Sequence, residues 1–336
     1  MPRNKFSFSR SSVELITGEN FSYLKKITDP STSILITDEN VFAAHGKKFK
    51  NWNTIVLKPG EKYKVQQTVD SIISQLIGFN CDRSFTLVGV GGGVITDLTG
   101  YVASVYMRGI RFGFVPTSLL CLVDASIGGK NGIDAGPYKN LVGTITQPAF
   151  ILHDISLLAT LPDEEFSNGF AEIIKHAVIK DAAMFRILED HDTAYFRKRK
   201  NELGALVKKN ALLKFKIARA DEFEKGERKL LNFGHTLGHA IENQYRLSHG
   251  QAISVGMAFA ARLSSEINNF SEEGRIINLL EKYGLPFYFS YDRNKVMDVL
   301  KMDKKKEKEN IHFILVEKIG KGIIRPVSID TIYRAL

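Results

Sequence analysis

Apolar positions in the first half of the chain gather into short runs that are separated by amphipathic segments. The runs are rich in Ile, Val, Leu and Phe, as buried strands are, and lie at 33–37, 54–57, 85–90 and 111–116. Between them, residues 64–78 and 94–106 repeat apolar positions at the period of a helix. Strands that alternate with helices predict a parallel sheet. We therefore expect an α/β domain over residues 1–160.

The periodicity changes after about residue 160, where longer helical segments take over. These predicted helices are 164–180, 182–191, 198–221, 235–243, 253–268 and 275–282. Two short apolar runs, 311–316 and 322–326, flank Ile319-Gly-Lys-Gly and predict a β-hairpin. We expect the second half to be a mostly helical domain over residues 161–336, with a ligand in the cleft between the two domains.

The composition of the 336 residues is that of a globular protein, with 44% apolar and 25% charged residues. No run approaches the roughly 18 consecutive apolar residues of a membrane-spanning helix, and the first residues lack the apolar core of a signal peptide. Cys81 and Cys121 are far apart and flanked by apolar residues. They are predicted to be buried thiols rather than a disulfide, which favours a cytoplasmic location.

Lys and Arg outnumber Asp and Glu by 46 to 37, a net charge of +9, so an anionic partner is expected. The densest basic segment, residues 301–308, has no aromatic residues between its lysines. Surfaces that bind single-stranded nucleic acid combine basic with aromatic side chains. We therefore predict a small anionic metabolite as the ligand, and neither a nucleic acid nor a membrane.

A glycine-rich turn joins a predicted strand to a predicted helix in the sequence Val88-Gly-Val-Gly-Gly-Gly-Val-Ile-Thr-Asp. Backbone that approaches a pyrophosphate closely needs residues without Cβ, and the N-terminus of a helix favours negative charge. Val94 stands where the dinucleotide-binding fingerprint has its third glycine. The turn thus indicates a nucleotide site, and a tight turn without a ligand stays an alternative.

Four polar side chains follow in turns that are rich in glycine and other small residues, namely Asp124, Lys130, Lys139 and Asn140. A single lysine is usually a solvated surface charge. Several polar groups set in turns whose backbone can lie against a ligand favour a binding site instead.

The candidates for metal binding are a few histidines and one glutamate. His235 and His239 are four residues apart and share a helix face, and His249 follows ten residues later. On another predicted helix, Glu172 and His176 share a face. Such a set fits a Zn²⁺ site with an open position. The spacing suggests that His235 and His239 both bind the metal, and it leaves His176 open as a further ligand.

Several long motifs follow one another along the chain: GGGVITD, YMRGI, VPTSLL, VDASIGGKNG, GFAEIIKH, LNFGHTLGHAIE and SHGQAISVGM. Together they resemble the 3-dehydroquinate synthase family of sugar-phosphate cyclases, from about Asp38 to Lys305. The resemblance implies an NAD-binding α/β domain with a parallel sheet and a mostly helical domain that binds metal and substrate. It also implies a cytoplasmic homodimer.

The resemblance implies an NAD- and metal-dependent lyase of the shikimate pathway, which leads to chorismate and the aromatic amino acids. Such enzymes convert 3-deoxy-D-arabino-heptulosonate 7-phosphate into 3-dehydroquinate and phosphate, with NAD⁺ and Zn²⁺ or Co²⁺. A hydroxyl is oxidised transiently, phosphate is eliminated, and the hydride returns before the new ring closes. A sister cyclase, a polyol dehydrogenase and a non-catalytic binding module remain alternatives.

Site residues follow from the resemblance, motif by motif. It implies that Glu172, His235 and His249 bind the metal and that His239 serves the substrate or a proton relay. The implied NAD contacts are Asp38, Glu61, Lys64, Gly92, Gly93, Asp97, Thr117, Ser118, Asp124, Lys130, Lys139 and Thr160. The implied substrate contacts are Arg108, Asp124, Lys130, Lys139, Asn140, Lys175, Lys214, Arg228, Asn232, His239 and Lys304. Those expected to act in catalysis are Lys130, Lys175, Lys214, Arg228, Asn232 and His239. Arg108 resembles a residue that reaches the site of a neighbouring subunit.

Some positions depart from the family pattern. Asn131 stands where threonine is common, Ser118 replaces the second threonine of a Pro-Thr-Thr motif, and residues 133–140 differ in sequence. These departures concern the geometry of the loop rather than the reaction. Arg228 and Lys214 are the candidates for the substrate carboxylate, which a guanidinium can hold through two parallel hydrogen bonds. The alternative for Arg228 is a solvated charge between two charged neighbours.

Overall fold

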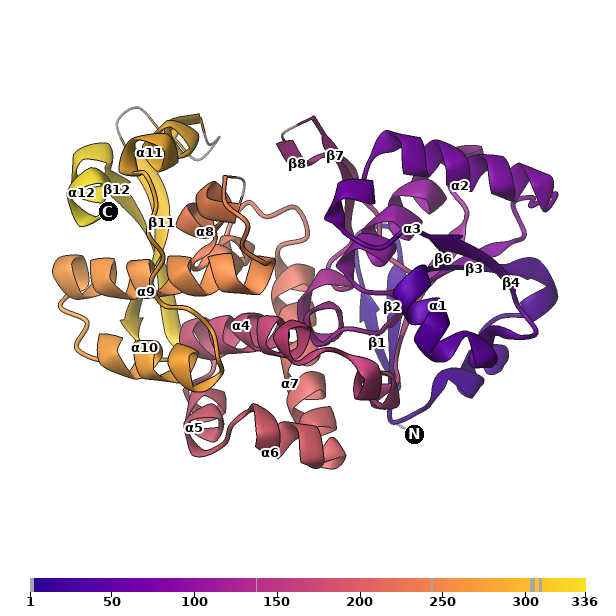
Figure 1. The fold of residues 1–336 in the computed structure, drawn as a ribbon, viewed down its shortest axis with the longest axis horizontal. Coiled ribbons are helices and arrows are strands. Elements are labelled where there is room, and N and C mark those ends of the chain that lie inside the picture. The colour runs from indigo at the N-terminus through magenta and orange to yellow at the C-terminus, as the bar shows by residue number, and fades with distance from the viewer. Residues whose placement is uncertain (1–2, 137, 243, 303–305, 308–309) are drawn as a thin grey trace. The chain divides into compact units, whose positions relative to one another are not determined.

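The computed structural model describes residues 3–136, 138–242, 244–302, 306–307 and 310–336 (Figure 1). The chain divides into two compact units. The first, here called the sheet unit, comprises the residues up to Glu165 together with Lys200–Phe223. The second, the helical unit, comprises Phe166–Arg199 and the residues from Glu224 onward. That residues 1–160 bind NAD and residues 161–336 bind metal and substrate stays a prediction.

A seven-stranded sheet lies at the centre of the sheet unit, in the order β1-β2-β9-β6-β5-β3-β4. The bounds are β1 Arg3–Ser7, β2 Ser12–Thr17, β3 Ser33–Asp38, β4 Asn53–Leu57, β5 Thr86–Gly91, β6 Arg111–Pro116 and β9 Phe150–His153. β1 pairs with β2 in the antiparallel sense, and the other neighbours are parallel. The predicted parallel α/β sheet is confirmed, and the predicted strands correspond to β3, β4, β5 and β6.

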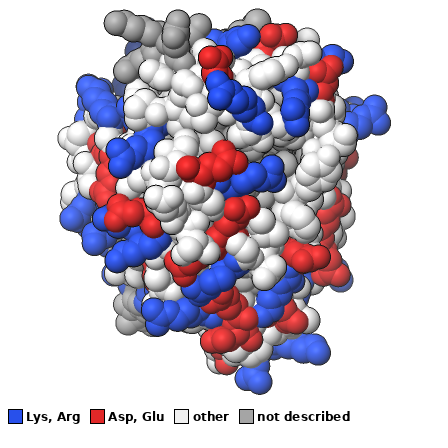
Figure 2. Space-filling model, turned by 90° about the vertical axis from the view of Figure 1, so that its left-hand side faces the viewer, with Lys and Arg blue, Asp and Glu red and all other residues white. Residues whose placement is uncertain are grey.

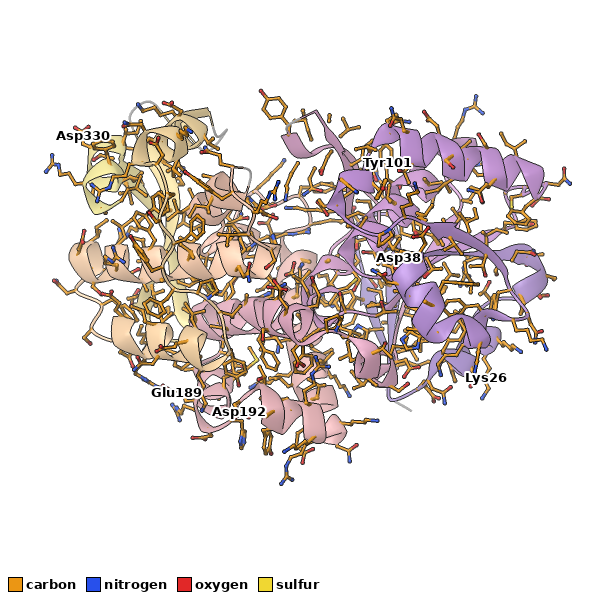
Figure 3. The ribbon with its side chains drawn as sticks, in the orientation of Figure 1. Lys26, Asp38, Tyr101, Glu189, Asp192 and Asp330 are labelled. Carbon is orange, nitrogen blue, oxygen red and sulfur yellow. The ribbon has the colours of Figure 1, made fainter. Side chains whose placement is uncertain are left out.

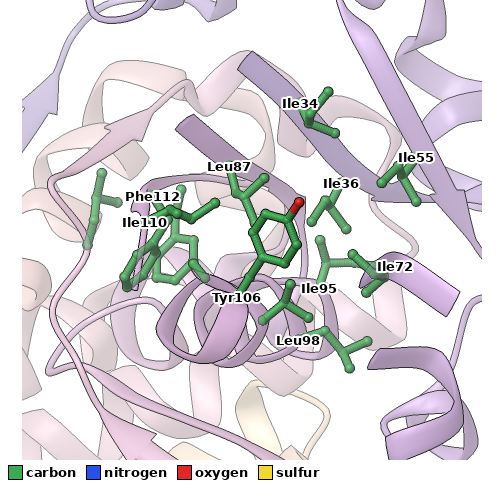
Figure 4. Packing of buried hydrophobic residues seen from close by; sticks show 14 of the residues in the cluster. Ile34, Ile36, Ile55, Ile72, Leu87, Ile95, Leu98, Tyr106, Ile110 and Phe112 are labelled. Atoms are coloured by element: carbon green, nitrogen blue, oxygen red, sulfur yellow. The ribbon is translucent and has the colours of Figure 1, made fainter. Parts of the chain in front are cut away.

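Successive residues of the central strands point to opposite faces of the sheet, and each face has its own core. The helices that belong wholly to this unit are α1 (Glu39–His45), α2 (Gln66–Gly78), α3 (Gly93–Val105) and α7 (Lys200–Ala220). Ile34 and Ile36 of β3 pack with Ile72 of α2 and Ile95 of α3 (Figure 4). Leu35, between them in sequence, lies in the other core. Burial on both faces explains why these strands are continuous apolar runs.

The strand order creates a switch point between β3 and β5. After β3 the chain adds β4 on one side, and after β5 it adds β6 and later β9 on the other side. In open parallel sheets, ligands bind at the carboxyl ends of the strands at such a point. Asp38 ends β3 and Gly91 ends β5, so the glycine-rich turn lies at the place where a nucleotide is expected.

Some elements of the sheet unit were not predicted. They include α1, β1, β2, β9 and the hairpin of β7 (Lys130–Ala135) and β8 (Tyr138–Ile145). The predicted helix 198–221 is interrupted at Arg199, after which α7 begins. Phe215 of α7 stacks on Phe6 of β1 with ring centroids 4.1 Å apart. This contact helps to hold α7 in the sheet unit.

The helical unit is mostly helical, as predicted, with a small antiparallel sheet. Its helices are α4 (Asp163–Lys180, which begins in the sheet unit), α5 (Ala182–Asp190), α6 (Thr193–Lys198), α8 (His235–Glu242), α9 (His249–Asn268), α10 (Glu273–Lys282), α11 (Arg293–Met302) and α12 (Ile329–Ala335). The sheet contains β10 (Lys306–Glu307), β11 (Asn310–Lys318) and β12 (Lys321–Ser328). The predicted hairpin is confirmed as β11 and β12. α6, α11 and α12 were not predicted, and residue 243 lies outside the described residues.

α9 begins four residues before its predicted start. Ser248 Oγ accepts a hydrogen bond from Gln251 N, and Gln251 Oε1 accepts one from Ser248 N at 3.0 Å. This reciprocal pair is a capping box, which fixes the first turn of a helix. As a result, His249 is the first residue of α9 rather than part of a loop.

Three further expectations concern the composition. Cys81 and Cys121 are buried and form no disulfide, as predicted. Among the described residues, no helix combines the length and the apolar composition needed to cross a bilayer. Figure 2 shows one face of the molecule, on which basic and acidic side chains are interspersed. On that face the basic residues do not gather into the continuous stripe typical of nucleic-acid binding.

Candidate active site

The glycine-rich turn after β5 contains two kinds of glycine. A Cβ on Gly91 would lie 2.6 Å from the Cβ of Ile95, so this glycine allows β5 and α3 to pack closely. A Cβ on Gly92 or Gly93 would meet no atom of another residue of the structure closer than 3.4 Å. The fold itself therefore tolerates a methyl group at positions 92 and 93. The N-terminus of α3, which begins at Gly93, favours negative charge and so suits an anionic group such as a phosphate.

Three other predicted NAD contacts lie at the same edge of the sheet. Asp38 is labelled in Figure 3 beside α1, whose first turn it caps by accepting a hydrogen bond from Val41 N at 2.9 Å. Burial raises the pKa of Asp38. Thr117 N donates to Gly91 O at 2.9 Å, which joins the end of β6 to the end of β5, and Ser118 follows. The structure thus gathers these residues around the switch point.

Lys64 is the buried cation at the centre of another group of predicted residues. Its Nζ lies 2.6 Å from Asp97 Oδ2, 2.5 Å from Asn140 Oδ1 and 3.6 Å from Glu61 Oε1. Burial lowers the pKa of Lys64, but the Asp97 and Glu61 carboxylates outweigh it and raise that pKa. Burial raises the pKa of Asp97 to about 6 despite the nearby ammonium. Lys64 therefore stays charged near pH 7, and Asp97 is mostly ionised there.

Lys214 and Asp124 form a second ion pair of predicted residues. Lys214, on α7, donates from Nζ to Asp124 Oδ1 at 2.7 Å and to Asp124 O at 2.7 Å. Asp124 lies in a π-helical turn, Cys121–Ala125. Turns of this kind are frequent at functional sites. The two contacts fix the position of the ammonium group.

The other predicted residues of the sheet unit lie on several different elements. Lys130 and Lys139 lie on the two strands of the β7–β8 hairpin, at an exposed and a half-buried position. Thr160 Oγ1 forms a hydrogen bond with His45 Nε2 at 2.9 Å. Arg108 is exposed and has a left-handed backbone with φ 65°. Such a conformation is uncommon for residues other than glycine and is often found at functional sites.

Asn131, a departure from the family pattern, has a structural role here. It is buried, and its Nδ2 donates to Gly129 O and to Thr146 O, both at 2.9 Å. A Cβ on Gly100 would lie 1.9 Å from Asn131 Oδ1, so the amide packs directly on α3. Asn131 therefore helps to attach the β7–β8 hairpin to α3.

Glu172, His235 and His249 come together although they lie on three different helices. Glu172 is fully buried within α4, and the two histidines are the first residues of α8 and α9. Glu172 Oε1 lies 3.6 Å from His235 Nε2 and 3.5 Å from His249 Nε2. In a tetrahedral zinc site with bonds of about 2.0–2.2 Å, two ligand atoms lie roughly 3.3–3.6 Å apart. The spacing fits three ligands of one ion and leaves the fourth position to a substrate or water.

Hydrogen bonds on the other side of each imidazole determine which nitrogen faces Glu172. His235 Nδ1 lies 3.1 Å from Phe233 O, and His249 Nδ1 lies 3.3 Å from Glu242 Oε2. A carbonyl and a carboxylate only accept hydrogen bonds, so each Nδ1 carries a hydrogen. Each Nε2 is thereby the nitrogen that a metal would bind, an arrangement common in metal sites.

The pKa values of the two histidines differ. Burial holds the pKa of His235 well below its usual value, so this ring is neutral near pH 7. Burial also lowers the pKa of His249, but hydrogen bonds to Glu172 and Glu242 outweigh it and raise that pKa to about 9. Without an ion, a proton therefore joins His249 to Glu172. A divalent cation would replace that proton, since metal binding requires the neutral imidazole.

The spacing suggested that His235 and His239 bind the same metal ion, but the structure groups His235 with Glu172 and His249 instead. The rings of His235 and His239 are close, with centroids 5.0 Å apart, but His239 is exposed. His239 instead belongs to a second group with Glu242 and His249. Neither of these two groups in the described part of the helical unit contains His235 and His239 together. The group with Glu172 contains a fully buried carboxylate, whereas the carboxylate of the group with His239 belongs to the partly exposed Glu242.

The predicted substrate residues of the helical unit lie mainly in buried positions. Lys175, one turn from Glu172 on α4, forms an ion pair with its carboxylate. Arg228 is only 3% exposed although both its sequence neighbours are exposed, so it is not a solvated charge. Asn232 is half-buried. Lys304 lies outside the described residues.

Glu242 is a residue of this region that the sequence analysis did not single out. Its side chain is 8% exposed and contacts His249 Nδ1. Helical periodicity contains the signal, because residues 235, 239 and 242 share one face of α8. The contact itself depends on how α8 and α9 pack, which the periodicity of one helix does not reveal.

Two family models match consecutive parts of this chain. Residues 54–168 match the model described as the N-terminal part of 3-dehydroquinate synthase, and residues 169–306 match its C-terminal part. A 3-dehydroquinate synthase of Saccharolobus solfataricus is 37% identical over 335 residues, which cover 96% of this chain and 94% of that protein. A protein of the same description from Pyrococcus abyssi is 39% identical over 285 residues, which cover 84% of each chain.

Solved structures similar to this chain include two synthases, each 25% identical. The 2-epi-5-epi-valiolone synthase of Streptomyces hygroscopicus, with NAD⁺ and Zn²⁺ bound, has a TM-score of 0.90 and covers 98% of this chain and 97% of that one. A 2-deoxy-scyllo-inosose synthase complexed with carbaglucose-6-phosphate, NAD⁺ and Co²⁺ has a TM-score of 0.86 and covers 99% and 98%. An iron-containing alcohol dehydrogenase, 14% identical with a TM-score of 0.68, shares the fold.

Proposed function

The chain belongs to the 3-dehydroquinate synthase family, and we propose that it performs the family's reaction with NAD⁺ and one divalent ion, Zn²⁺ or Co²⁺. It is an enzyme, a phosphate-eliminating lyase that converts 3-deoxy-D-arabino-heptulosonate 7-phosphate into 3-dehydroquinate in the shikimate pathway. The convergence of Glu172 Oε1 with the Nε2 atoms of His235 and His249 is the observation that carries the metal part.

When bound, the ion supplies Lewis acidity toward a substrate hydroxyl, and NAD⁺ accepts and returns a hydride. Glu172, His235 and His249 would hold the ion. Gly92 and Gly93 would lie against the pyrophosphate of NAD⁺ at the N-terminus of α3, because they carry no side chain and the N-terminus of a helix favours negative charge. The other proposed NAD contacts surround the same edge of the sheet or the Lys64 group, namely Asp38, Glu61, Lys64, Asp97, Thr117, Ser118, Asp124, Lys130, Lys139 and Thr160.

Charged residues of the chain would bind the two anionic ends of the substrate. The heptulosonate has a carboxylate at one end and a phosphate at the other, so each end requires a cation. Arg228 is the proposed partner of the carboxylate, since it is buried and a guanidinium can form two parallel hydrogen bonds. The other proposed substrate contacts are Arg108, Asp124, Lys130, Lys139, Asn140, Lys175, Lys214, Asn232, His239 and Lys304.

One incubation distinguishes this reaction from that of a polyol dehydrogenase. The enzyme is mixed with NAD⁺ and the heptulosonate phosphate, and inorganic phosphate and the absorbance of NADH are followed together. A cyclase releases phosphate without accumulating NADH, because the hydride returns in each turnover. Steady accumulation of NADH would indicate a dehydrogenase instead.

We also propose a cytoplasmic homodimer in which Arg108 reaches the site of the partner. The exposed position of Arg108 and its unusual backbone support this role, and the two reduced cysteines support the location. Arg108→Ala and His235→Ala chains should each be inactive alone. Mixed dimers should regain activity, because one of their two sites then has an intact His235 and an intact Arg108. Absence of any recovery in dimers shown to be mixed would contradict the proposal.

A further inference from the structure

The contacts of His249 give Glu242 a specific role. We propose that Glu242 is a positioning residue, whose carboxylate holds the Nδ1–H of His249 and so directs His249 Nε2 toward the ion. The inference rests on the metal site proposed above and adds to it a residue that the assignments by motif did not contain.

The need for such a residue follows from how differently the three ligands are held. The side chains of Glu172 and His235 are 0% and 11% exposed, whereas that of His249 is 34% exposed. Packing therefore restricts the first two more than the third. His235 is also anchored through Nδ1 to a backbone carbonyl only two residues away, at Phe233. For His249 the corresponding acceptor is a side chain, Glu242 Oε2, at 3.3 Å.

The backbone of His249 is fixed by other contacts. Ser248 Oγ donates to Asn168 Oδ1 at 2.7 Å, and Asn168 lies one turn before Glu172 on α4. A Cβ on Gly250 would lie 2.5 Å from Asn168 Cα, so the first turn of α9 packs directly against α4. These contacts set the distance between the Glu172 and His249 backbones. The rotation of the His249 ring remains to be set, and Glu242 has the position to set it.

A carboxylate behind a histidine ligand has two effects on metal binding. It fixes the tautomer with the hydrogen on Nδ1, and it makes Nε2 a stronger donor. Removing such a partner typically weakens metal binding about 10–100-fold. The side chain of Glu242 is 8% exposed, so the hydrogen bond is largely protected from competing water.

The structure also contains a second group of potential metal ligands, and the test must distinguish a metal bound there from one bound by Glu172, His235 and His249. The ligand atoms of His239, Glu242 and His249 also lie within 4.8 Å of one another. In that arrangement Glu242 would itself be a ligand, and His239 would be another. Exchange of His239 would then weaken metal binding, whereas a positioning role of Glu242 predicts that it does not.

The test is a Co²⁺ titration of the metal-free protein without NAD⁺ or substrate, followed by visible absorption. Glu242→Gln should bind Co²⁺ about 10–100-fold more weakly than the unchanged protein, and Glu242→Ala more weakly still, because glutamine can still accept the Nδ1 hydrogen bond. At saturation the Co²⁺ spectrum should stay that of the unchanged protein, since the ligands are the same. Glu281→Gln, an exposed carboxylate on α10, is the matched control and should bind normally.

Three results would overturn the inference. The first is equal Co²⁺ affinity of Glu242→Gln and the unchanged protein. The second is a changed spectrum at saturation together with weaker binding by His239→Asn, which would make Glu242 a ligand. The third is no Co²⁺ binding by the unchanged protein, which would remove the metal site itself and is recognised because it does not depend on Glu242.

Discussion

Replacing Arg228 with methionine keeps most of the volume of the side chain and removes its charge. Arg228 is 3% exposed, so a substrate carboxylate bound to it would be largely shielded from water. Without the guanidinium, that carboxylate would be buried without its partner. Truncating one partner of such a pair costs about 2–4 kcal/mol. For a transition state this corresponds to a loss of about 30-fold to 900-fold in kcat/KM.

The assay compares two substrates on matched variants. The first is the heptulosonate phosphate, and the second is sedoheptulose 7-phosphate, which lacks the carboxylate. Arg228→Met should lose activity on the acid, and Arg228→Lys should recover only part of it, because an ammonium cannot form two parallel hydrogen bonds. Lys229→Met removes the exposed neighbouring charge and should change kcat/KM less than about twofold.

Three results would refute this reasoning about Arg228. One is equal cyclisation of both substrates by the unchanged enzyme. Another is a loss on Lys229→Met as large as that on Arg228→Met. The third is full activity of Arg228→Met on the acid. A thermal unfolding midpoint within a few degrees of the unchanged protein would show that each variant is folded, so that the kinetic comparison is valid.

Three further predictions concern the cofactor, the core and the metal. Gly92→Val should bind NAD⁺ weakly in titration calorimetry and stay folded in an unfolding experiment. Gly91→Val, by contrast, should lose stability, because a Cβ at this position would lie 2.6 Å from Ile95. If Gly92→Val bound NAD⁺ as tightly as the unchanged protein, Gly92 would have only a structural role. Burial lowers the pKa of His153 to about 3 in the folded chain. When the pH falls below the usual histidine pKa, the unfolded chain therefore binds a proton at this residue and the folded chain does not. Protonation of His153 in the unfolded chain should lower the free energy of unfolding by about 2–3 kcal/mol between pH 7 and 4.5. In denaturant unfolding, His153→Leu should not show this part of the decrease. Prolonged chelation should abolish turnover and added Zn²⁺ or Co²⁺ should restore it; full activity of a preparation shown to be metal-free would contradict the site.

The strands that were predictable share one physical property, burial on both faces. Residues 33–38 are almost all buried, so their apolar run is continuous and independent of the surroundings. β1, by contrast, reads Arg-Asn-Lys-Phe-Ser and alternates exposed with half-buried positions at the edge of the sheet. β9 is only four residues long. An edge strand or a very short one depends on its neighbours more than on its own pattern.

The start of α9 shows why a hydrophobic pattern fails beside a polar site. The apolar period begins at Ile253, but the helix begins at His249 because Ser248 and Gln251 form a capping box. The first turn has the sequence His-Gly-Gln, which has no apolar side chain to reveal it. Because the first turn consists of polar residues and glycine, among them the proposed metal ligand His249, the apolar period does not detect it.

The motifs supplied candidate residues for the site, but they did not indicate which of these side chains contact one another. Nothing in the spacing of Lys64 and Asn140 indicates that these side chains meet, since the contact requires the β7–β8 hairpin that was not predicted. In the same way, spacing alone favoured His235 with His239, two neighbours on one helix. The structure instead joins His235 and His249 to Glu172 through the packing of three helices.

The amount of product formed per NAD⁺ is the most direct test of a reaction in which NAD⁺ is regenerated in each turnover. The metal-loaded enzyme is given excess heptulosonate phosphate and an amount of NAD⁺ equal to the number of sites, and the products are identified and counted by NMR. We expect many equivalents of 3-dehydroquinate and phosphate for each NAD⁺, with NAD⁺ still oxidised at the end. Product that stops at one equivalent per NAD⁺, with a matching amount of NADH, would contradict this expectation.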